Sequence, residues 1–167
     1  MDKPKTLLVL RHAKSTWDEP DKQDLDRALK TRGLNDIKLL AREVQPTVIN
    51  LDTIFSSPAN RAIHTAILFS LTVGFPLEKI CITKKLYETD EYQLEEFVKG
   101  FSDDLNTVMI VGHNPTSTDF VNLFLNETIY NIPTSGLVGL SFSSTKWMKI
   151  GKSSLLSSFF HFPKEFQ

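Results

Sequence analysis

Arginine and histidine side chains follow three apolar stretches of this sequence, at the point where each stretch ends. Arg11 and His12 come directly after the first stretch. Arg61 lies a few residues beyond the second stretch, and His113 follows the third. Arginine offers planar, bidentate donors to an anion, and histidine is a nucleophile when neutral and a donor when protonated. We expect such a set to bind phosphate, because a phosphoryl group in transfer is stabilised by positioning and by positive charge.

The three apolar stretches are typical of buried strands, and they cover residues 6–10, 52–56 and 106–112. The carboxyl ends of neighbouring parallel strands lie at one edge of a sheet, where α/β proteins hold their ligands. Each motif alone also has a structural explanation, such as a helix cap or a solvated arginine. Their occurrence at the same topological point favours one shared pocket.

Helical patterns separate these strands. Apolar residues recur at three- and four-residue spacing in two regions, 29–44 and 92–101. Ser57-Pro58 and Asn114-Pro115 predict two further helix starts, with Ser57 and Asn114 as N-caps and proline at the first helical position. Helices that start there would direct free N–H groups and positive dipole ends toward the same sheet edge.

The rest of the chain adds shorter elements and one long polar loop. Residues 13–26 are predicted to form a loop over the site, and residues 79–83 a short strand. Residues 137–142 and 147–151 are predicted to be two strands joined by a polar turn, with a further strand possible from Ser153. The pattern predicts a single α/β/α three-layer domain with a mostly parallel central sheet.

Length and composition limit the class of protein. The 167 residues suffice for one domain, covering 1–167, with its own core. A formal net charge of −1 argues against a nucleic-acid partner. Cys81 is the only cysteine, so an internal disulfide is excluded, and no Cys/His cluster has zinc-like spacing. No stretch is long enough for a signal h-region or a membrane span, so we expect a cytoplasmic protein with no membrane partner.

Three motifs resemble those of the histidine phosphatase superfamily, also called phosphoglycerate mutase-like. They occur in the same order, as LRHAKS at 10–15, SSPANRAIHTA at 56–66 and VGHNP at 111–115. The resemblance extends from Thr6 to about Phe142. The short chain, Leu86-Tyr87-Glu88 and the PTSG sequence at 133–136 are most similar to the compact branch named for the SixA phosphohistidine phosphatase. The resemblance implies a phosphoglycerate mutase-like fold.

The resemblance also implies roles for the four central residues. His12 would be the nucleophile that becomes phosphohistidine. Arg11 and Arg61 would grip the phosphoryl oxygens, and His113 would donate to them as the transition state forms. The resemblance implies that no metal or other cofactor is needed.

Three more residues complete the predicted site. Ser15 would add a hydrogen bond to the phosphoryl group, and Asn114 would bind phosphate beside His113. Glu88 is the candidate proton donor, because it occupies a position similar to that of the acid in the mutase-like branch. A surface glutamate in an acidic loop is the alternative for Glu88. Phosphohistidine tolerates a weak acid, because protonated imidazole is already a good leaving group near its pKa.

The predicted function is hydrolysis of a phosphoryl group through a phosphohistidine intermediate, with phosphohistidine-bearing protein as the leading substrate. One alternative is a small-molecule phosphomonoesterase. The other is a phosphate- or phosphopeptide-binding module with little turnover, for which two histidines beyond the arginines would be unnecessary. Mutase activity is disfavoured because the short chain lacks material for a cap. The sequence indicates no oligomeric state.

Overall fold

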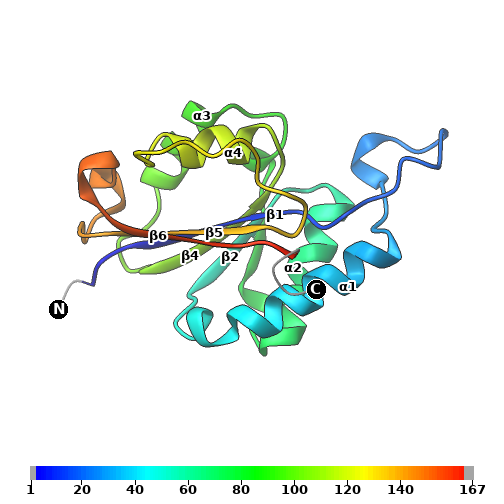
Figure 1. Ribbon diagram of the computed structural model, residues 1–167, viewed down its shortest axis with the longest axis horizontal. Coiled ribbons are helices and arrows are strands. Elements are labelled where there is room, and N and C mark those ends of the chain that lie inside the picture. Colours follow the sequence, from blue (N-terminus) through cyan, green and yellow to red (C-terminus); the bar gives the residue numbers. More distant parts are fainter. Residues whose placement is uncertain (1–2, 164–167) are drawn as a thin grey trace.

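The computed structural model describes residues 3–163, which form a layered α/β structure around one sheet (Figure 1). Within these residues the sheet has six strands in the order β3-β2-β4-β1-β5-β6. The strands are β1 (Thr6–Arg11), β2 (Thr53–Ser56), β3 (Ile80–Ile82), β4 (Thr107–Gly112), β5 (Leu137–Phe142) and β6 (Leu155–His161). Parallel pairing joins β1, β2, β3 and β4, whereas β5 is antiparallel to both β1 and β6. The predicted fold class is confirmed.

Two helices cover each face of the sheet (Figure 1). One face carries α1 (Thr31–Val44) and α2 (Asn60–Val73), and the other carries α3 (Glu91–Lys99) and α4 (Thr116–Asn122). Short 3-10 helices lie at Asp24–Asp26, Gln45–Val48, Leu77–Lys79, Lys84–Leu86, Trp147–Lys149 and Lys152–Ser154. Within residues 3–163, none of the helices has the length and apolar character needed to cross a membrane.

Strand β1 shows how the layers are held together. Its side chains alternate between the two faces, because successive residues of a strand point in opposite directions. Leu7 and Val9 pack in the core with α3 and α4, whereas Leu8 and Leu10 pack in the core with α1 and α2. A strand that is buried on both faces reads as a continuous apolar run, which is why β1 is recognisable in the sequence.

The strand register brings the predicted motifs to one edge. Arg11 of β1 lies opposite Gly112 of β4, and the His12 amide donates to the Gly112 carbonyl at 3.1 Å. Ser56 of β2 lies opposite Val111 on the other side of β4. The three strands are therefore parallel neighbours, as predicted, and their carboxyl ends share one edge of the sheet.

Both predicted helix starts are wrong by a few residues. Helix α2 begins at Asn60 with Ala59 as N-cap, and α4 begins at Thr116 after Pro115, in each case without a side-chain cap. The Ser57 hydroxyl instead contacts His113, and the side chain of Asn114 bonds to the loop at 131–132. Site contacts therefore take the place of capping at both positions.

The predicted strand at 147–151 is also wrong. Residues Trp147–Lys149 form a 3-10 helix, and β5 pairs instead with β6. The indole of Trp147 is fully buried, and its Nε1 donates to the Leu105 carbonyl at 2.8 Å. The apolar residues of this segment are therefore explained by the buried side chain of Trp147, and they do not form a strand. Cys81 is exposed, because β3 lies at the edge of the sheet.

Residues 13–26 form the predicted polar loop, which projects beyond the sheet edge (Figure 1). Its two ends meet where Ser15 pairs antiparallel with Leu29, next to a hydrogen bond from the Thr16 amide to the Ala28 carbonyl. These backbone contacts close the base of the loop. The segment beyond them carries the side chains that reach back over the site.

Candidate active site

The two predicted histidines lie against each other at the carboxyl ends of β1 and β4. The ring centroids of His12 and His113 are 5.1 Å apart, with the ring planes tilted by 49°. His12 is buried, and its Nδ1 lies 2.8 Å from the Ala13 carbonyl oxygen. Because that oxygen can only accept, Nδ1 carries the hydrogen and Nε2 keeps its lone pair.

Burial sets the charge of His12. Removal from water disfavours the protonated ring, and the charges of His113, Arg61 and Arg11 act in the same direction, so that the pKa of His12 is lowered to about 3 despite its bond to Ala13. His12 is therefore neutral near neutral pH. A neutral imidazole with a free Nε2 is the form that attacks phosphorus.

The ring of His113 is held through Nε2, whereas the ring of His12 is held through Nδ1. Its Nε2 lies 2.7 Å from the Ser57 hydroxyl, which also accepts a hydrogen bond from the Ala59 amide. When the hydroxyl donates its hydrogen to Nε2, the ring hydrogen of His113 lies on Nδ1. That Nδ1 is buried and has no hydrogen-bond partner among the described residues. Burial, followed by the charge of Arg61, lowers the pKa of His113 to about 4.

The two predicted arginines are each anchored by terminal guanidinium nitrogens. Arg11 Nη1 donates to the Ile132 carbonyl at 2.7 Å. Arg61, in the first turn of α2, donates from Nη1 to the Asp24 carbonyl at 2.6 Å and from Nη2 to its carboxylate at 2.9 Å. The Nε atoms of both arginines are buried and lack a partner within residues 3–163. Buried donors without partners are rare and indicate a site for an anion.

Ser15 and Asn114 have their side chains committed to protein contacts. The Ser15 hydroxyl is buried and accepts from Arg27 Nη2 at 2.7 Å. The Asn114 amide donates to Asn131 and to the Ile132 carbonyl, which is also the acceptor for Arg11. Asn114 therefore braces the loop that positions Arg11. Direct phosphate contacts from Ser15 and Asn114 stay predictions.

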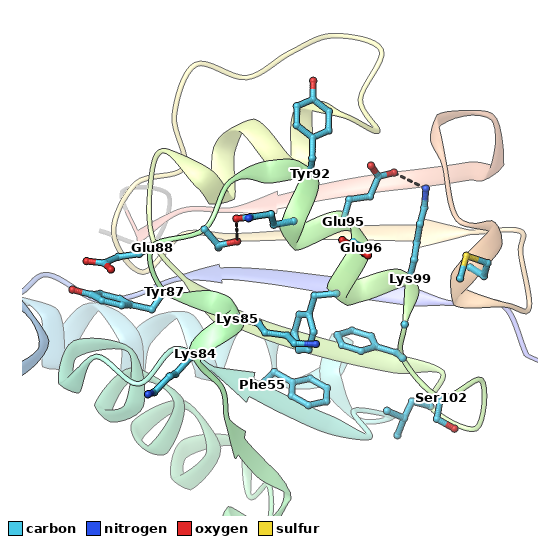
Figure 2. A pocket seen from close by; sticks show the side chains of 17 residues that line it. Phe55, Lys84, Lys85, Tyr87, Glu88, Tyr92, Glu95, Glu96, Lys99 and Ser102 are labelled. Carbon is cyan, nitrogen blue, oxygen red and sulfur yellow. Dashed lines mark hydrogen bonds and ion pairs between the residues drawn. The ribbon is translucent and has the colours of Figure 1, made fainter.

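Glu88 lies at the mouth of the site. It lines a pocket of about 460 Å³ together with Arg61 and His113, and its side chain is exposed. Its backbone is left-handed, with φ of 51°. That conformation is uncommon for a residue other than glycine and is often found at functional sites. In Figure 2 the side chains of Tyr87 and Glu88 project to the same side of the segment before α3.

Sequence patterns missed a residue that contacts Arg61 at the rim of the site, Asp24. Its carboxylate accepts hydrogen bonds from Tyr87 Oη at 2.8 Å, Arg61 Nη2 at 2.9 Å and Arg27 Nη1 at 3.0 Å. Burial alone would raise the pKa of Asp24, but the bonds from Tyr87, Arg61 and Arg27 lower it to about 2. Arg27 is buried. An acid three residues before an arginine was the available signal for this pair.

A larger groove adjoins the pocket and shares Tyr87, Glu88 and Thr89 with it. The groove has a volume of about 1240 Å³ and runs along α3 toward Met148 (Figure 2). Its floor is an aromatic cluster of Phe55, Phe97 and Phe101, in which the ring centroids are 4.8 to 5.4 Å apart. Tyr92 and Met148, on its rim, are 65% and 68% exposed. The surface next to the site is therefore large and partly apolar.

No group of three or more metal-ligating His, Cys, Asp or Glu side chains is found in the part of the chain that the structure describes.

A family model for the histidine phosphatase superfamily (branch 1) matches residues 7–99. The chain belongs to the histidine phosphatase superfamily. The matched segment contains Arg11, His12, Arg61 and Glu88. His113 lies beyond this segment. Its position beside His12 is therefore known from the structure and not from the family model.

Relatives place the chain more closely within the superfamily. An uncharacterised protein of Mycobacterium leprae is 28% identical over 167 residues, covering 93% of this chain and 100% of that protein. A structure assigned to the phosphohistidine phosphatase SixA of Agrobacterium tumefaciens is 27% identical, with a TM-score of 0.74 over 83% of this chain and 92% of that one. The protein histidine phosphatase SixA in complex with tungstate has a TM-score of 0.77 at 18% identity, covering 97% and 99% of the two chains, which shows a shared fold. The predicted resemblance to the SixA-like branch is confirmed.

Proposed function

We propose that this protein is a phosphatase that hydrolyses phosphohistidine in proteins through a phosphohistidine intermediate on His12. The observation that carries the proposal is the neutral His12 ring, with Nε2 free, packed against His113 and close enough to Arg11 and Arg61 to feel their charges. A nucleophile, a hydrogen-bond donor and two guanidinium groups are the parts that phosphoryl transfer requires. Location in the cytoplasm and the lack of nucleic-acid partners stay predictions of the sequence.

The reaction would proceed in two displacements. The lone pair of His12 Nε2 forms a bond to phosphorus while the bond from phosphorus to the substrate nitrogen breaks, and that electron pair stays with the leaving ring. Water then attacks the phosphorus of phosphorylated His12, the bond to Nε2 breaks, and its electron pair returns to the ring. The product is dihydrogen phosphate, and His12 keeps its Nδ1 hydrogen throughout.

Two observations support a protein as the substrate. The groove along α3 opens beside the pocket and is larger than a small phosphomonoester needs. The names of the SixA structures describe proteins that act on phosphohistidine or on protein histidine. A polypeptide that presents a phosphorylated side chain to His12 would lie across this groove.

The deciding experiment measures turnover of a phosphohistidine-bearing protein by the wild type, His12→Ala and His64→Ala. We expect acid-labile phosphate on His12 by mass spectrometry in the wild type, and no detectable turnover in His12→Ala. His64→Ala is the control, because His64 is an exposed histidine on α2. Full activity in His12→Ala would exclude the mechanism. Tight phosphate binding without turnover of any substrate would identify a binding module instead.

A small-molecule phosphomonoesterase is the second candidate, and Glu88 is the observation that favours it. An alkoxide leaving group needs a proton, and Glu88 lines the pocket of His113. If this candidate holds, turnover of sugar phosphates or nucleotides exceeds that of phosphohistidine protein. Glu88→Gln is then expected to lower kcat on these esters about 100-fold, with little effect on phosphohistidine.

A further inference from the structure

Asp24 is an anion placed at the rim of a site built to bind an anion. It belongs to the polar loop and lines the same pocket as Arg61, His113 and Glu88. Its side chain is 42% exposed, so part of the carboxylate faces solvent in the pocket. Neither the phosphoryl clamp nor the attack by His12 requires a carboxylate at this position.

The surrounding contacts hold Asp24 firmly. Arg61 binds both its backbone carbonyl and its carboxylate, and Tyr87 donates to the same carboxylate oxygen as Arg61. Arg27 binds the other oxygen from a buried position, where its guanidinium also donates to the Thr16 carbonyl. Three hydrogen bonds, from Arg61, Tyr87 and Arg27, therefore fix the carboxylate, and a fourth from Arg61 holds the backbone carbonyl of Asp24.

Aromatic contacts connect this carboxylate to the reacting centre. Tyr87, which donates to Asp24, packs its ring edge-on against His113 with centroids 5.7 Å apart. His113 in turn lies against the ring of His12. A leaving group that departs from phosphorus into the pocket would therefore pass close to the negative charge of Asp24.

We infer that Asp24 is a specificity-determining residue, which favours phosphorylated substrates whose leaving ring is cationic while it is bound to phosphorus, and disfavours those whose leaving group becomes an anion. This role rests on the proposed function, and it adds which charge the leaving group of a favoured substrate carries. The hydrogen bonds that lower the pKa of Asp24 to about 2 keep it negative at every pH at which the enzyme would work.

The sign of the effect follows from the charge of the breaking bond. A phosphohistidine ring that carries a hydrogen on its other nitrogen is cationic, and it leaves as neutral imidazole when the electron pair of the phosphorus–nitrogen bond returns to it. No external acid is consumed. A phosphate ester instead leaves negative charge on oxygen as its bond breaks. Relative to the free substrate, a nearby carboxylate stabilises the first transition state, in which the ring still carries part of its positive charge, and destabilises the second.

The test compares Asp24→Asn with the wild type on two small substrates, free phosphohistidine and para-nitrophenyl phosphate. Both are small, so the groove along α3 contributes little to either. We expect kcat/KM to fall about tenfold for phosphohistidine and to rise for the nitrophenyl ester, because the variant removes one negative charge from the rim. The two rates thus change in opposite directions.

Two variants separate charge from positioning. Asp18→Asn removes the same charge from the same loop, but Asp18 bonds to Thr16 and Lys30, away from the site, so both rates are expected to stay unchanged. Tyr87→Phe removes one bond to Asp24 and keeps its charge. The ratio of the two rates is then expected to change less than in Asp24→Asn.

Parallel changes in Asp24→Asn would overturn the inference. An equal fall on both substrates means that Asp24 only positions Arg61, and an equal rise means that it competes with the phosphoryl group. Absence of wild-type turnover on phosphohistidine, in free form and in protein, would instead contradict the proposed function itself.

Discussion

The two histidines of the site are oriented by opposite ring nitrogens. His12 gives its Nδ1 hydrogen to a backbone carbonyl and keeps Nε2 free, whereas His113 engages Ser57 through Nε2 and keeps Nδ1 free. In the proposed function, the first ring would attack phosphorus and the second would donate to a phosphoryl oxygen. The hydroxyl of Ser57 decides which hydrogen His113 can offer.

Ser57→Ala is therefore expected to lower kcat about tenfold, with little change in KM, because the orientation of His113 is lost. The matched control is Ser70→Ala, which removes another fully buried serine hydroxyl, one without a partner in the described structure. Steady-state kinetics on phosphohistidine would test this, with thermal melts to confirm folding. A similar loss of kcat in both variants would contradict the role of Ser57.

Acid is expected to destabilise the ligand-free protein through these two rings. Burial lowers the pKa of His12 to about 3 and that of His113 to about 4, from the ordinary value of 6.5. Below pH 6.5 the unfolded chain binds more protons than the folded protein. Stability is therefore lost as the pH falls from 6.5 toward 3, and His12 accounts for about 2 kcal/mol of the loss at about pH 5.

Urea denaturation at neutral pH and near pH 5, in phosphate-free buffer, measures this loss. His12→Gln cannot titrate, so its free energy of unfolding is expected to fall by about 2 kcal/mol less than that of the wild type. His64→Gln removes an exposed histidine and serves as the control. Equal losses in the wild type and His12→Gln would show that His12 titrates normally in the folded protein.

Residue types and their positions after strands sufficed to predict that Arg11, His12, Arg61 and His113 meet at one edge of the sheet. Asp24 could not be predicted in this way, because its partners Arg61 and Tyr87 are 37 and 63 residues away in the chain. A local pattern of apolar and polar residues does not reveal contacts between residues so far apart in the chain. The same limit applied to Ser57, whose hydroxyl has a partner 56 residues further along.

At the scale of elements, apolar runs that are buried on both faces predicted the strands more accurately than sequence patterns predicted the helix starts. They predicted β1, β2 and β4 to within about a residue, whereas helix starts were shifted because Ser57 and Asn114 make site contacts in place of caps. The strand predicted at 147–151 was wrong because the buried indole of Trp147 gives an apolar pattern in a segment that does not pair with a strand.

Helix α1 depends on one glycine to approach the loop that follows His12. A Cβ at Gly33 would lie 2.3 Å from the Lys14 backbone oxygen. The Lys14 oxygen also accepts the Lys30 amide at 2.8 Å, so it cannot simply move away. Gly33→Ala is expected to cost about 2 kcal/mol and to displace the turn after His12.

We expect Gly33→Ala to lower the melting temperature by about 6 °C and to reduce kcat as well. Gly151→Ala is the matched control, because a Cβ there meets no atom within 4 Å and the backbone is extended. Calorimetry and steady-state kinetics test both effects. A melting temperature that is unchanged in Gly33→Ala would show that this approach does not constrain the loop.

At the scale of the whole molecule, the proposed function predicts that the pocket binds the phosphoryl group and that the groove along α3 binds the rest of a protein substrate. The combined variant Tyr92→Ala and Met148→Ala removes two exposed side chains from the rim of the groove. We expect its KM for a phosphohistidine protein to rise about tenfold, since contact residues at an interface can each contribute on the order of 1 kcal/mol. Turnover of free phosphohistidine should be unchanged.

Leu71→Ala is the control for this experiment. Leu71 is 62% exposed on α2, on the face of the sheet opposite to α3 (Figure 1). Equal KM values for the protein substrate in the wild type and the groove variant would show that the groove does not take part in binding. A parallel loss on free phosphohistidine would instead indicate damage to the site.

The closed base of the polar loop affects how this enzyme can diversify. Pairing of Ser15 with Leu29, and of Thr16 with Ala28, separates residues 17–27 from the strand that carries His12. Insertions, deletions and changes of charge within 17–23 are therefore expected to leave His12 in register and to keep Asp24, which binds Arg61. Selection on substrate preference can act on this part of the loop without removing the contacts that hold Arg61, and the same part can be varied in laboratory evolution.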